Sequence, residues 1–225
     1  TLVTTLSMEG EIVDQYETVF GVRHFHFDPE TGFSLNGVPM KLKGVCCHQD
    51  HAGVGAAVPP SLQKWRVARL KETGVNAIRS SHNPPDPALL DACDQLGVMF
   101  MDEMRLPGAS DEVLTQLDGL IRRDRNHPSV ILWSLGNEEM IVQHTEVGLN
   151  MFRRMQHLAH KLDPSRKTTY AMNMRWIDIC DIHDQAGFRF DVWGSNYRSG
   201  QKSENYDIFH EKYPDWPLIG AETWG

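Results

Sequence analysis

Polar and titratable side chains stand directly after short apolar runs at several places along the chain, and the carboxylic acids Glu138 and Glu222 are among them. The groups of side chains are His48-Gln49-Asp50-His51, Arg79-Ser80-Ser81-His82-Asn83, Asp102-Glu103, Asn137-Glu138-Glu139, Ser195-Asn196-Tyr197 and Glu222. If the fold brings these groups together, two carboxyl groups face one pocket lined by His, Arg, Asn and Tyr. One acid can then protonate a leaving oxygen while the other attacks an anomeric carbon, which is the chemistry of glycoside hydrolysis.

The apolar runs alternate with amphipathic segments, and this alternation predicts the elements that position the polar groups. The runs expected to form strands are Leu42–Cys47, Val75–Arg79, Val98–Asp102, Val130–Ser134, Thr168–Ala171, Val192–Asn196 and Leu218–Ala221. The expected helices are Ser61–Thr73 with Ser61 as N-cap, a helix that opens at Asp86-Pro87 and closes at Gly97, Ser110–Arg123, Ile141–Leu162 and Glu204–Lys212. Strands that alternate with helices predict a parallel sheet with crossover helices.

The number of strands and the residues that follow them favour an α/β fold of the (β/α)8 or TIM barrel type. Such barrels place their catalytic groups at the C-terminal ends of the strands. A doubly wound sheet is the main alternative, but no glycine-rich phosphate loop follows any of the runs. We therefore predict that residues 28–225 form a catalytic barrel with strands one to seven present and the eighth missing.

The first 45 residues differ from this pattern and are expected to form strands, with hairpins among them. Thr1–Leu6 and Ile12–Phe20 flank Gly10, and Gly21–Phe27 continues with the period of two that is typical of strands. A second hairpin is expected around Asn36-Gly37, a pair that favours a type I′ turn.

The composition excludes several classes of partner. Lys+Arg number 22 and Asp+Glu 30, and this net charge of −8 argues against nucleic acid and anionic membrane surfaces. No apolar run reaches the roughly 18 residues that a membrane span requires. The cysteines follow no zinc or redox spacing, so unpaired thiols are expected. The chain opens at Thr1 without a Met and looks like a piece of a longer polypeptide, which leaves the compartment, cytoplasm or periplasm, open.

One stretch carries a specific resemblance. Residues 125–138 (RNHPSVILWSLGNE) resemble the acid/base signature of glycoside hydrolase family 2, which contains β-galactosidases, β-glucuronidases and β-mannosidases. Further segments that resemble this family follow the same order along the chain: 33–45 (FSLNGVPMKLKGV), 76–84 (NAIRSSHNP), 98–103 and 218–222 (LIGAE). The resemblance covers nearly the whole chain and implies that residues 1–27 are the last strands of an immunoglobulin-like β-sandwich domain.

The resemblance also implies roles for individual residues. Glu138 would be the general acid/base and Glu222 the nucleophile, and Asn137 would bind the 2-hydroxyl of the sugar. Arg79 would lie beside Glu222 and keep it ionised. The other residues expected to line the sugar pocket are His48, His82 and Tyr197.

No metal or cofactor is predicted. After the third strand the large metal-dependent β-galactosidases carry Glu and His ligands, whereas here Asp102-Glu103 leads through Met104-Arg105 into Leu-Pro-Gly. His48 and His51 could instead form a metal pair, but the further His and Asp ligands of such sites are not evident. Trp193 and Trp224, beside strand ends, are candidates for an aromatic surface that stacks on sugar.

Each of these residues also has a purely structural interpretation. Without the segment that precedes it, Glu138 would read as an exposed helix start, and Arg79 could be part of a structural ion pair. Taken together, the resemblance implies a retaining exo-β-glycosidase with a carbohydrate substrate, and a β-D-galactoside above all. The alternatives are a β-glucuronidase or β-mannosidase of the same family, or a sugar-binding barrel without activity; further domains are expected, and a homo-oligomer is left open.

Overall fold

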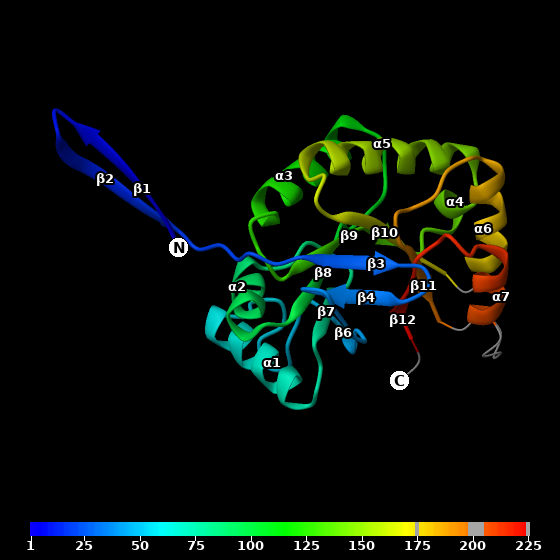
Figure 1. Ribbon diagram of the computed structural model, residues 1–225, viewed down its shortest axis with the longest axis horizontal. Coiled ribbons are helices and arrows are strands. Elements are labelled where there is room, and N and C mark those ends of the chain that lie inside the picture. Colours follow the sequence, from blue (N-terminus) through cyan, green and yellow to red (C-terminus); the bar gives the residue numbers. More distant parts are fainter. Residues whose placement is uncertain (174–175, 198–204, 224–225) are drawn as a thin grey trace.

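Seven parallel strands form the centre of the molecule in the computed structural model, which describes residues 1–173, 176–197 and 205–223 (Figure 1). Their order in the sheet is β12-β11-β10-β9-β8-β7-β6, so each strand pairs with its neighbours along the chain. The strands are β6 (Gly44–Cys47), β7 (Ala77–Ser80), β8 (Met99–Glu103), β9 (Val130–Asn137), β10 (Lys167–Met172), β11 (Trp193–Asn196) and β12 (Leu218–Glu222). The predicted α/β barrel of seven strands is confirmed.

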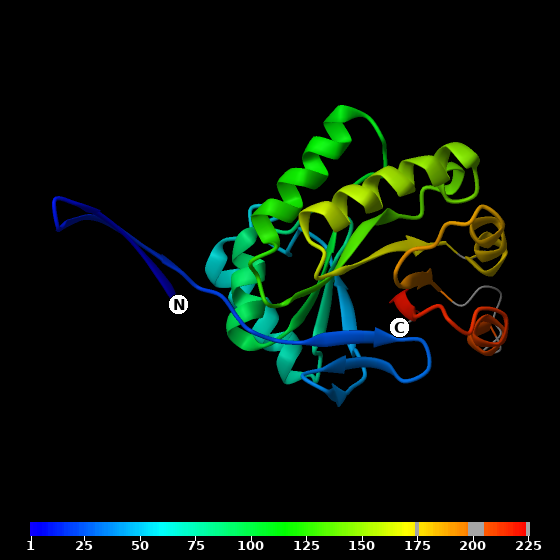
Figure 2. The same ribbon diagram turned by 45° about the horizontal axis from the view of Figure 1, so that its top comes forward.

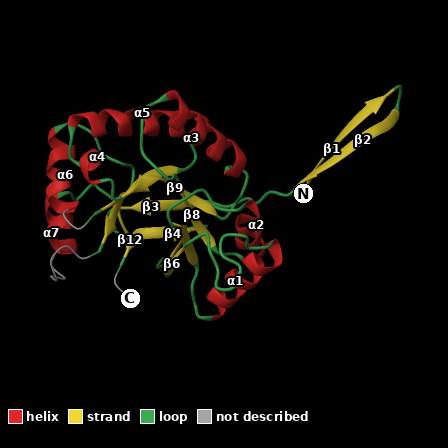
Figure 3. Ribbon diagram, turned by 180° about the vertical axis from the view of Figure 1, so that it is seen from behind, coloured by secondary structure: helices red, strands yellow, loops and turns green. Residues whose placement is uncertain are grey.

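The helices surround the curved sheet as an arc (Figure 3). They are α1 (Pro60–Glu72), α2 (Pro87–Leu96), α3 (Asp111–Asp124), α4 (Met140–Gln143), α5 (Glu146–Leu162), α6 (Trp176–Gln185) and α7 (Asn205–Lys212). Within the described residues, β6 and β12 are the two edge strands of the sheet, and each pairs with a neighbouring strand on one side only. No helix covers the gap between α7 and α1. The barrel is therefore open along one side. None of the described helices has the length and apolar character to span a bilayer.

Two helix starts have side-chain caps, of which the sequence predicts the one at Asp86, and a third differs from its prediction. The Asp86 carboxylate accepts a hydrogen bond from the Ala88 backbone N–H at 2.8 Å, and Ser110 caps α3 in the same way. The prediction of Ser61 as the N-cap of α1 is wrong. The N-cap is Pro59, and Pro60 occupies the first helical position, where its missing N–H costs nothing and its fixed φ suits a helix.

The single helix expected over Ile141–Leu162 is two helices, α4 and α5, and that prediction is corrected. The Thr145 hydroxyl accepts a hydrogen bond from the Gly148 backbone N–H at 3.2 Å and caps a new helix there. A Cβ at Gly148 would lie 1.8 Å from the Val142 carbonyl oxygen, so the two helices meet at a point that only glycine allows. The helix α6 is not expected from the sequence pattern.

Side chains on β8 alternate between two apolar layers. Met99 and Met101 belong to the inner layer, together with residues of β9, β10 and β12, whereas Phe100 belongs to the outer layer between the sheet and the helices. The same alternation directs Glu103 into the barrel and Asp102 toward the helices. The two acids are therefore neighbours in sequence that serve opposite faces of the sheet.

A three-stranded sheet covers the N-terminal end of the barrel. It consists of β3 (Phe25–Asp28), β4 (Gly32–Leu35) and β5 (Val38–Pro39), and its Phe27 and Phe33 pack into the inner apolar layer. Asn36 and Gly37 have φ values of +51° and +79°, the left-handed pair of the predicted type I′ turn.

The N-terminal hairpin of β1 (Leu2–Met8) and β2 (Glu11–Thr18) projects away from the barrel (Figure 2). Most of its side chains are exposed on both faces. The extended strand predicted over Gly21–Phe27 begins only at Phe25, because residues 19–24 form no ladder. Since β3 itself spans the boundary expected after residue 27, the assignment of residues 1–27 to an immunoglobulin-like domain stays a prediction.

A pair of carboxyl groups is fully buried between β8 and α3. Arg123 donates hydrogen bonds of 2.6 Å to both oxygens of Asp124, whereas neither oxygen of Asp102 accepts one from a donor within the described residues. Asp102, buried without a donor and close to the charge of Asp124, therefore favours its protonated form. Burial first, and then the charge of Asp124, raise the pKa of Asp102 well above its usual range.

This proton makes folding stability depend on pH. The unfolded chain releases it near pH 4 and the native state only at a higher pH, so the stabilisation is complete below about pH 4 and is lost at about 1.4 kcal/mol per pH unit up to the native pKa. We expect Asp102→Asn, which is neutral throughout, to flatten the pH dependence of thermal unfolding above about pH 4, where the unfolded chain has lost this proton and the native state still holds it. Glu112→Gln, an exposed change on α3, is the control. An unaltered slope in Asp102→Asn would contradict this interpretation.

Candidate active site

Arg79 is the centre of a buried polar network at the C-terminal ends of the strands. Its side chain on β7 is 4% exposed and forms ion pairs with Glu103 on β8 and Glu222 on β12, at 2.7 Å and 2.9 Å. Its Nη2 donates to Asn137 Oδ1 at 2.7 Å. Burial lowers the pKa of Arg79, but the charge of Glu103 and the hydrogen bonds to it outweigh this and raise the pKa above its usual value. The guanidinium is therefore a fixed positive charge.

His82 extends the network toward the barrel mouth. Its Nδ1 lies 2.9 Å from Glu103 Oε1, and its Nε2 lies 3.4 Å from Glu222 Oε1. The ring of His48 meets the ring of His82 edge to face, with 5.3 Å between the centroids. His48 itself is exposed. The His82 and His48 rings therefore connect the buried charged network with the solvent.

Tyr197 approaches Glu222 from the next strand end. Its backbone N–H donates to the Glu222 carbonyl oxygen at 2.6 Å, and it has a left-handed φ of +58°. A side-chain hydrogen bond to Glu222, with burial as a smaller cause, raises the pKa of Tyr197 to about 12. The phenol therefore stays protonated at neutral pH and donates to the Glu222 carboxylate.

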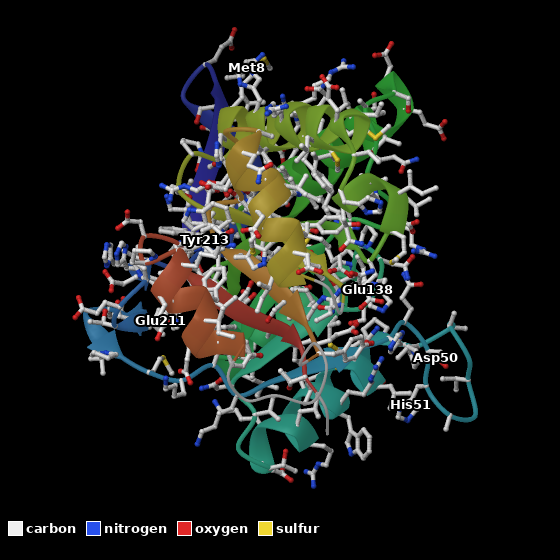
Figure 4. The ribbon with its side chains drawn as sticks, turned by 90° about the vertical axis from the view of Figure 1, so that its right-hand side faces the viewer. Met8, Asp50, His51, Glu138, Glu211 and Tyr213 are labelled. Carbon is white, nitrogen blue, oxygen red and sulfur yellow. The ribbon has the colours of Figure 1, made fainter. Side chains whose placement is uncertain are left out.

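Glu138 stands on the other side of the network, directly after β9. The Asn196 Nδ2 group donates to Glu138 Oε1 and to Asn137 Oδ1, both at 3.0 Å. Glu138 has a φ of +50°, in the left-handed region, and its backbone N–H donates to the Ala171 carbonyl oxygen at 3.0 Å. Figure 4 shows Glu138 on the same side of the molecule as the loop that carries Asp50 and His51.

A continuous chain of contacts joins the two acids. It runs from Glu222 through Arg79, Asn137 and Asn196 to Glu138, with links between 2.7 Å and 3.0 Å. Strands β12, β7, β9 and β11 supply these residues. The two carboxyl groups belong to one hydrogen-bonded network, and a fixed cation lies beside only one of them. Such a difference in surroundings allows one acid to act as nucleophile and the other as proton donor.

An open cavity of about 1050 Å³ lies against this network. It continues between β6 and β12 into the barrel interior, because the sheet is open there. The charged, imidazole and phenol side chains of its wall are His48, Arg79, His82, Tyr197 and Glu222, with Tyr206 and His210 of α7. Asn137, Glu138 and Asn196 are not part of that wall; Asn137 contacts it through Arg79, and Glu138 is linked to Asn137 through Asn196.

The structure thus brings all seven predicted site residues to one end of the barrel; their roles stay predictions. Glu103 and Asn196 are among the predicted strand-end groups but neither has a predicted role in the site, although Glu103 directly follows a predicted strand and Asn196 ends one. The alternation on β8 is the signal that could have found Glu103, because it faces inward with Met99 and Met101.

Other residues that the sequence singles out have structural explanations. Trp193 is 1% exposed and packs against His183 and Trp216, so its proposed role in sugar stacking is wrong, and Trp224 lies outside the described residues. The His51 ring lies edge-on against Trp65, with 6.0 Å between centroids.

Within the described ranges, neither His48 nor His51 belongs to a group with metal-ligand spacing. The group that does consists of Asp91, Asp94 and His127. His127 Nδ1 lies 2.7 Å from Asp94, which also accepts from the Ser129 backbone N–H. These contacts tie α2 to the start of β9, at the opposite end of that strand from Glu138.

The comparisons with known proteins agree with the geometry. The model of "Glycosyl hydrolases family 2, TIM barrel domain" matches residues 29–113 and 104–222. Beta-galactosidase BoGH2A of Bacteroides ovatus is 44% identical over 99% of the chain, and a beta-glucuronidase of Bacteroides fragilis is 34% identical over 98%. A crystal structure of a family 2 glycosyl hydrolase from Bacteroides cellulosilyticus has a TM-score of 0.87 at 33% identity and covers 99% of the chain.

The chain spans only part of these proteins: 30% of the galactosidase, 33% of the glucuronidase and 30% of the crystallised hydrolase. The family model, the relatives and the solved structure nevertheless match over nearly the whole chain. The chain therefore belongs to glycoside hydrolase family 2 and supplies strands of its TIM barrel domain.

Proposed function

We propose that this barrel is the catalytic domain of a retaining exo-β-glycosidase, with Glu222 as nucleophile and Glu138 as general acid/base. The observation that carries the proposal is the chain of contacts between Glu222 and Glu138 through Arg79 and Asn137. It gives the two acids different surroundings. Glu222 lies against a guanidinium and a phenol, whereas Glu138 is held by a neutral amide.

In the first step, a Glu222 oxygen attacks the anomeric carbon of the sugar and displaces the glycosidic oxygen. Glu138 gives its proton to that leaving oxygen, so the aglycone departs as a neutral alcohol. The covalent glycosyl-enzyme carries the opposite anomeric configuration. Arg79 and Tyr197, which donate to Glu222 in the free protein, hold the carboxylate in the orientation for attack.

In the second step, Glu138 is a carboxylate and removes a proton from a water molecule. The water attacks the anomeric carbon, the bond to Glu222 breaks, and the original configuration is restored. Asn137 supports both steps by donating its amide N–H to the 2-hydroxyl of the sugar, because its Oδ1 already accepts from Arg79 and Asn196. His48 and His82 line the space for the remaining hydroxyls.

For the substrate, we propose a terminal β-D-galactoside. The relative of 44% identity is named a beta-galactosidase, whereas the beta-glucuronidase of Bacteroides fragilis is 34% identical. A β-glucuronide is the second candidate, because the match to that glucuronidase extends over 98% of the chain. We also propose that the barrel belongs to a longer polypeptide whose preceding domain includes residues 1–27.

A panel of chromogenic β-glycosides tests the substrate in the full-length protein. We expect kcat/KM for the β-galactoside to exceed that for the β-glucuronide and the β-mannoside by about tenfold or more, since a site built for one hydroxyl pattern leaves polar groups unpaired with another. A preference for the glucuronide would replace the galactoside proposal and leave the mechanism intact. No turnover of any β-glycoside would contradict the proposed function itself.

A further inference from the structure

The proposed mechanism makes no use of Glu103, although it is the most completely bonded acid near the site. Its side chain has no exposed surface and makes four polar contacts. Oε2 accepts from Arg79 Nε and from the Ser134 hydroxyl, both at 2.7 Å. Oε1 accepts from Arg79 Nη2 at 2.9 Å and lies 2.9 Å from His82 Nδ1. A buried carboxylate with two donors on each oxygen is held in one position.

This contact determines which way Arg79 points. A guanidinium that grips a carboxylate through Nε and Nη2 has lost the freedom to rotate in its plane. The remaining donors are then aimed at Glu222, through Nη1 at 2.9 Å, and at Asn137, through Nη2 at 2.7 Å. Glu103 therefore sets the orientation of Arg79 from behind, on the side away from Glu222.

The same carboxylate orients His82. An ionised carboxylate only accepts hydrogen bonds, so the Nδ1 atom that faces Glu103 carries the proton. Nε2 is then turned toward Glu222 and the cavity. One buried acid thus fixes both groups that contact the proposed nucleophile from this side.

We propose that Glu103 is a positioning residue of the glycosidase, which holds Arg79 and His82 so that both face Glu222. The inference rests on the proposed function, because it assigns Glu103 a role through the proposed nucleophile. It also separates Glu103 from its neighbour. Asp102 is equally buried on the same strand, but it faces Asp124 and the helices.

The test compares Glu103→Gln with Asp102→Asn in the full-length protein. Both changes replace a buried carboxyl on β8 by an amide of the same shape. Only the first puts an NH₂ group where an oxygen accepts from Arg79, so that half of the two-point contact is lost. We expect Glu103→Gln to lower kcat about 100-fold with a much smaller change in KM, because a misplaced reacting group loses rate at that scale. Asp102→Asn keeps the wild-type kcat near neutral pH.

A second measurement reads the nucleophile directly. 2-Deoxy-2-fluoro-β-D-galactosyl fluoride, or the glucuronyl fluoride if the panel selects glucuronides, forms a slowly hydrolysed covalent adduct that mass spectrometry can locate. We expect wild type and Asp102→Asn to be labelled on Glu222 at equal rates, and folded Glu103→Gln to be labelled about 100-fold more slowly.

The outcomes separate the two proposals. A wild-type protein that hydrolyses the glycoside but is never labelled on Glu222 contradicts the proposed mechanism. Normal labelling and normal kcat in folded Glu103→Gln overturn the positioning role alone. If Glu103→Gln does not fold, Glu103→Asp is tested instead, because it keeps the charge on a side chain that is one methylene shorter. The proposal then requires kcat at least about tenfold below wild type, and a wild-type kcat in Glu103→Asp would overturn it.

Discussion

Replacing Glu222 by Gln is expected to abolish turnover of every glycoside, with kcat lowered by about 10⁴-fold or more. The amide keeps the shape of the side chain and can still accept the hydrogen bond from Arg79, so the network and the fold are retained. It cannot attack the anomeric carbon, and no other described carboxylate is held beside Arg79 at the cavity wall. Kinetics on an activated aryl glycoside and on a natural disaccharide measure the loss.

Glu211→Gln is the matched control, because Glu211 is an exposed glutamate on α7, the helix that precedes β12 (Figure 4). It should keep wild-type kinetics. Glu222→Ala with added azide provides a stereochemical check, since azide entering the emptied position attacks from the nucleophile's face and yields the α-glycosyl azide. Substantial activity in Glu222→Gln would remove Glu222 from its proposed role.

Glu138→Ala is expected to produce a loss that depends on the leaving group. Glycosides with poor leaving groups need the proton from Glu138 and should lose about 10²- to 10⁴-fold in kcat/KM. Activated aryl glycosides need no proton, so their kcat/KM should change far less. Their kcat should still fall, because no base remains to activate water for the second step.

Added azide should restore part of that kcat, because it needs no base, and the product should be the β-glycosyl azide. Glu139→Ala is the control one residue further along the chain. Glu139 contributes its backbone N–H to a 2.9 Å hydrogen bond with the Tyr170 hydroxyl, which an alanine retains. Equal losses for all leaving groups in Glu138→Ala would speak against an acid/base role.

The order of elements and the strand ends could be predicted from the sequence because each signal is local. Asp86, Gly97, Ser110 and the Asn36-Gly37 turn act through backbone geometry within a few residues. The break between α4 and α5 could not be predicted in this way. It depends on the close approach of Gly148 to Val142, which only the folded chain reveals.

The same distinction applies to the site. Glu138 and Glu222 could be singled out because the segments around them resemble glycoside hydrolase family 2; a carboxylate after an apolar run is a weak signal by itself. Glu103 accepts hydrogen bonds from Arg79 and Ser134, which are 24 and 31 residues away in the sequence, and no spacing pattern predicts those contacts. Trp193 shows the opposite error, since a residue beside a strand end was expected at the surface and is instead buried among other rings.

Because of the left-handed backbone at Glu138 and Tyr197, selection of variants for thermal stability conflicts with selection for activity. Any side chain other than glycine is strained at φ values of +50° and +58°, at a cost of about 1 kcal/mol or more for each residue. Glycine would relieve that strain at both positions and remove a carboxyl and a phenol from the barrel mouth. A library of variants ranked by melting temperature alone would therefore favour members that have lost these two groups, and screening for heat resistance in this barrel must be paired at every round with an assay of turnover.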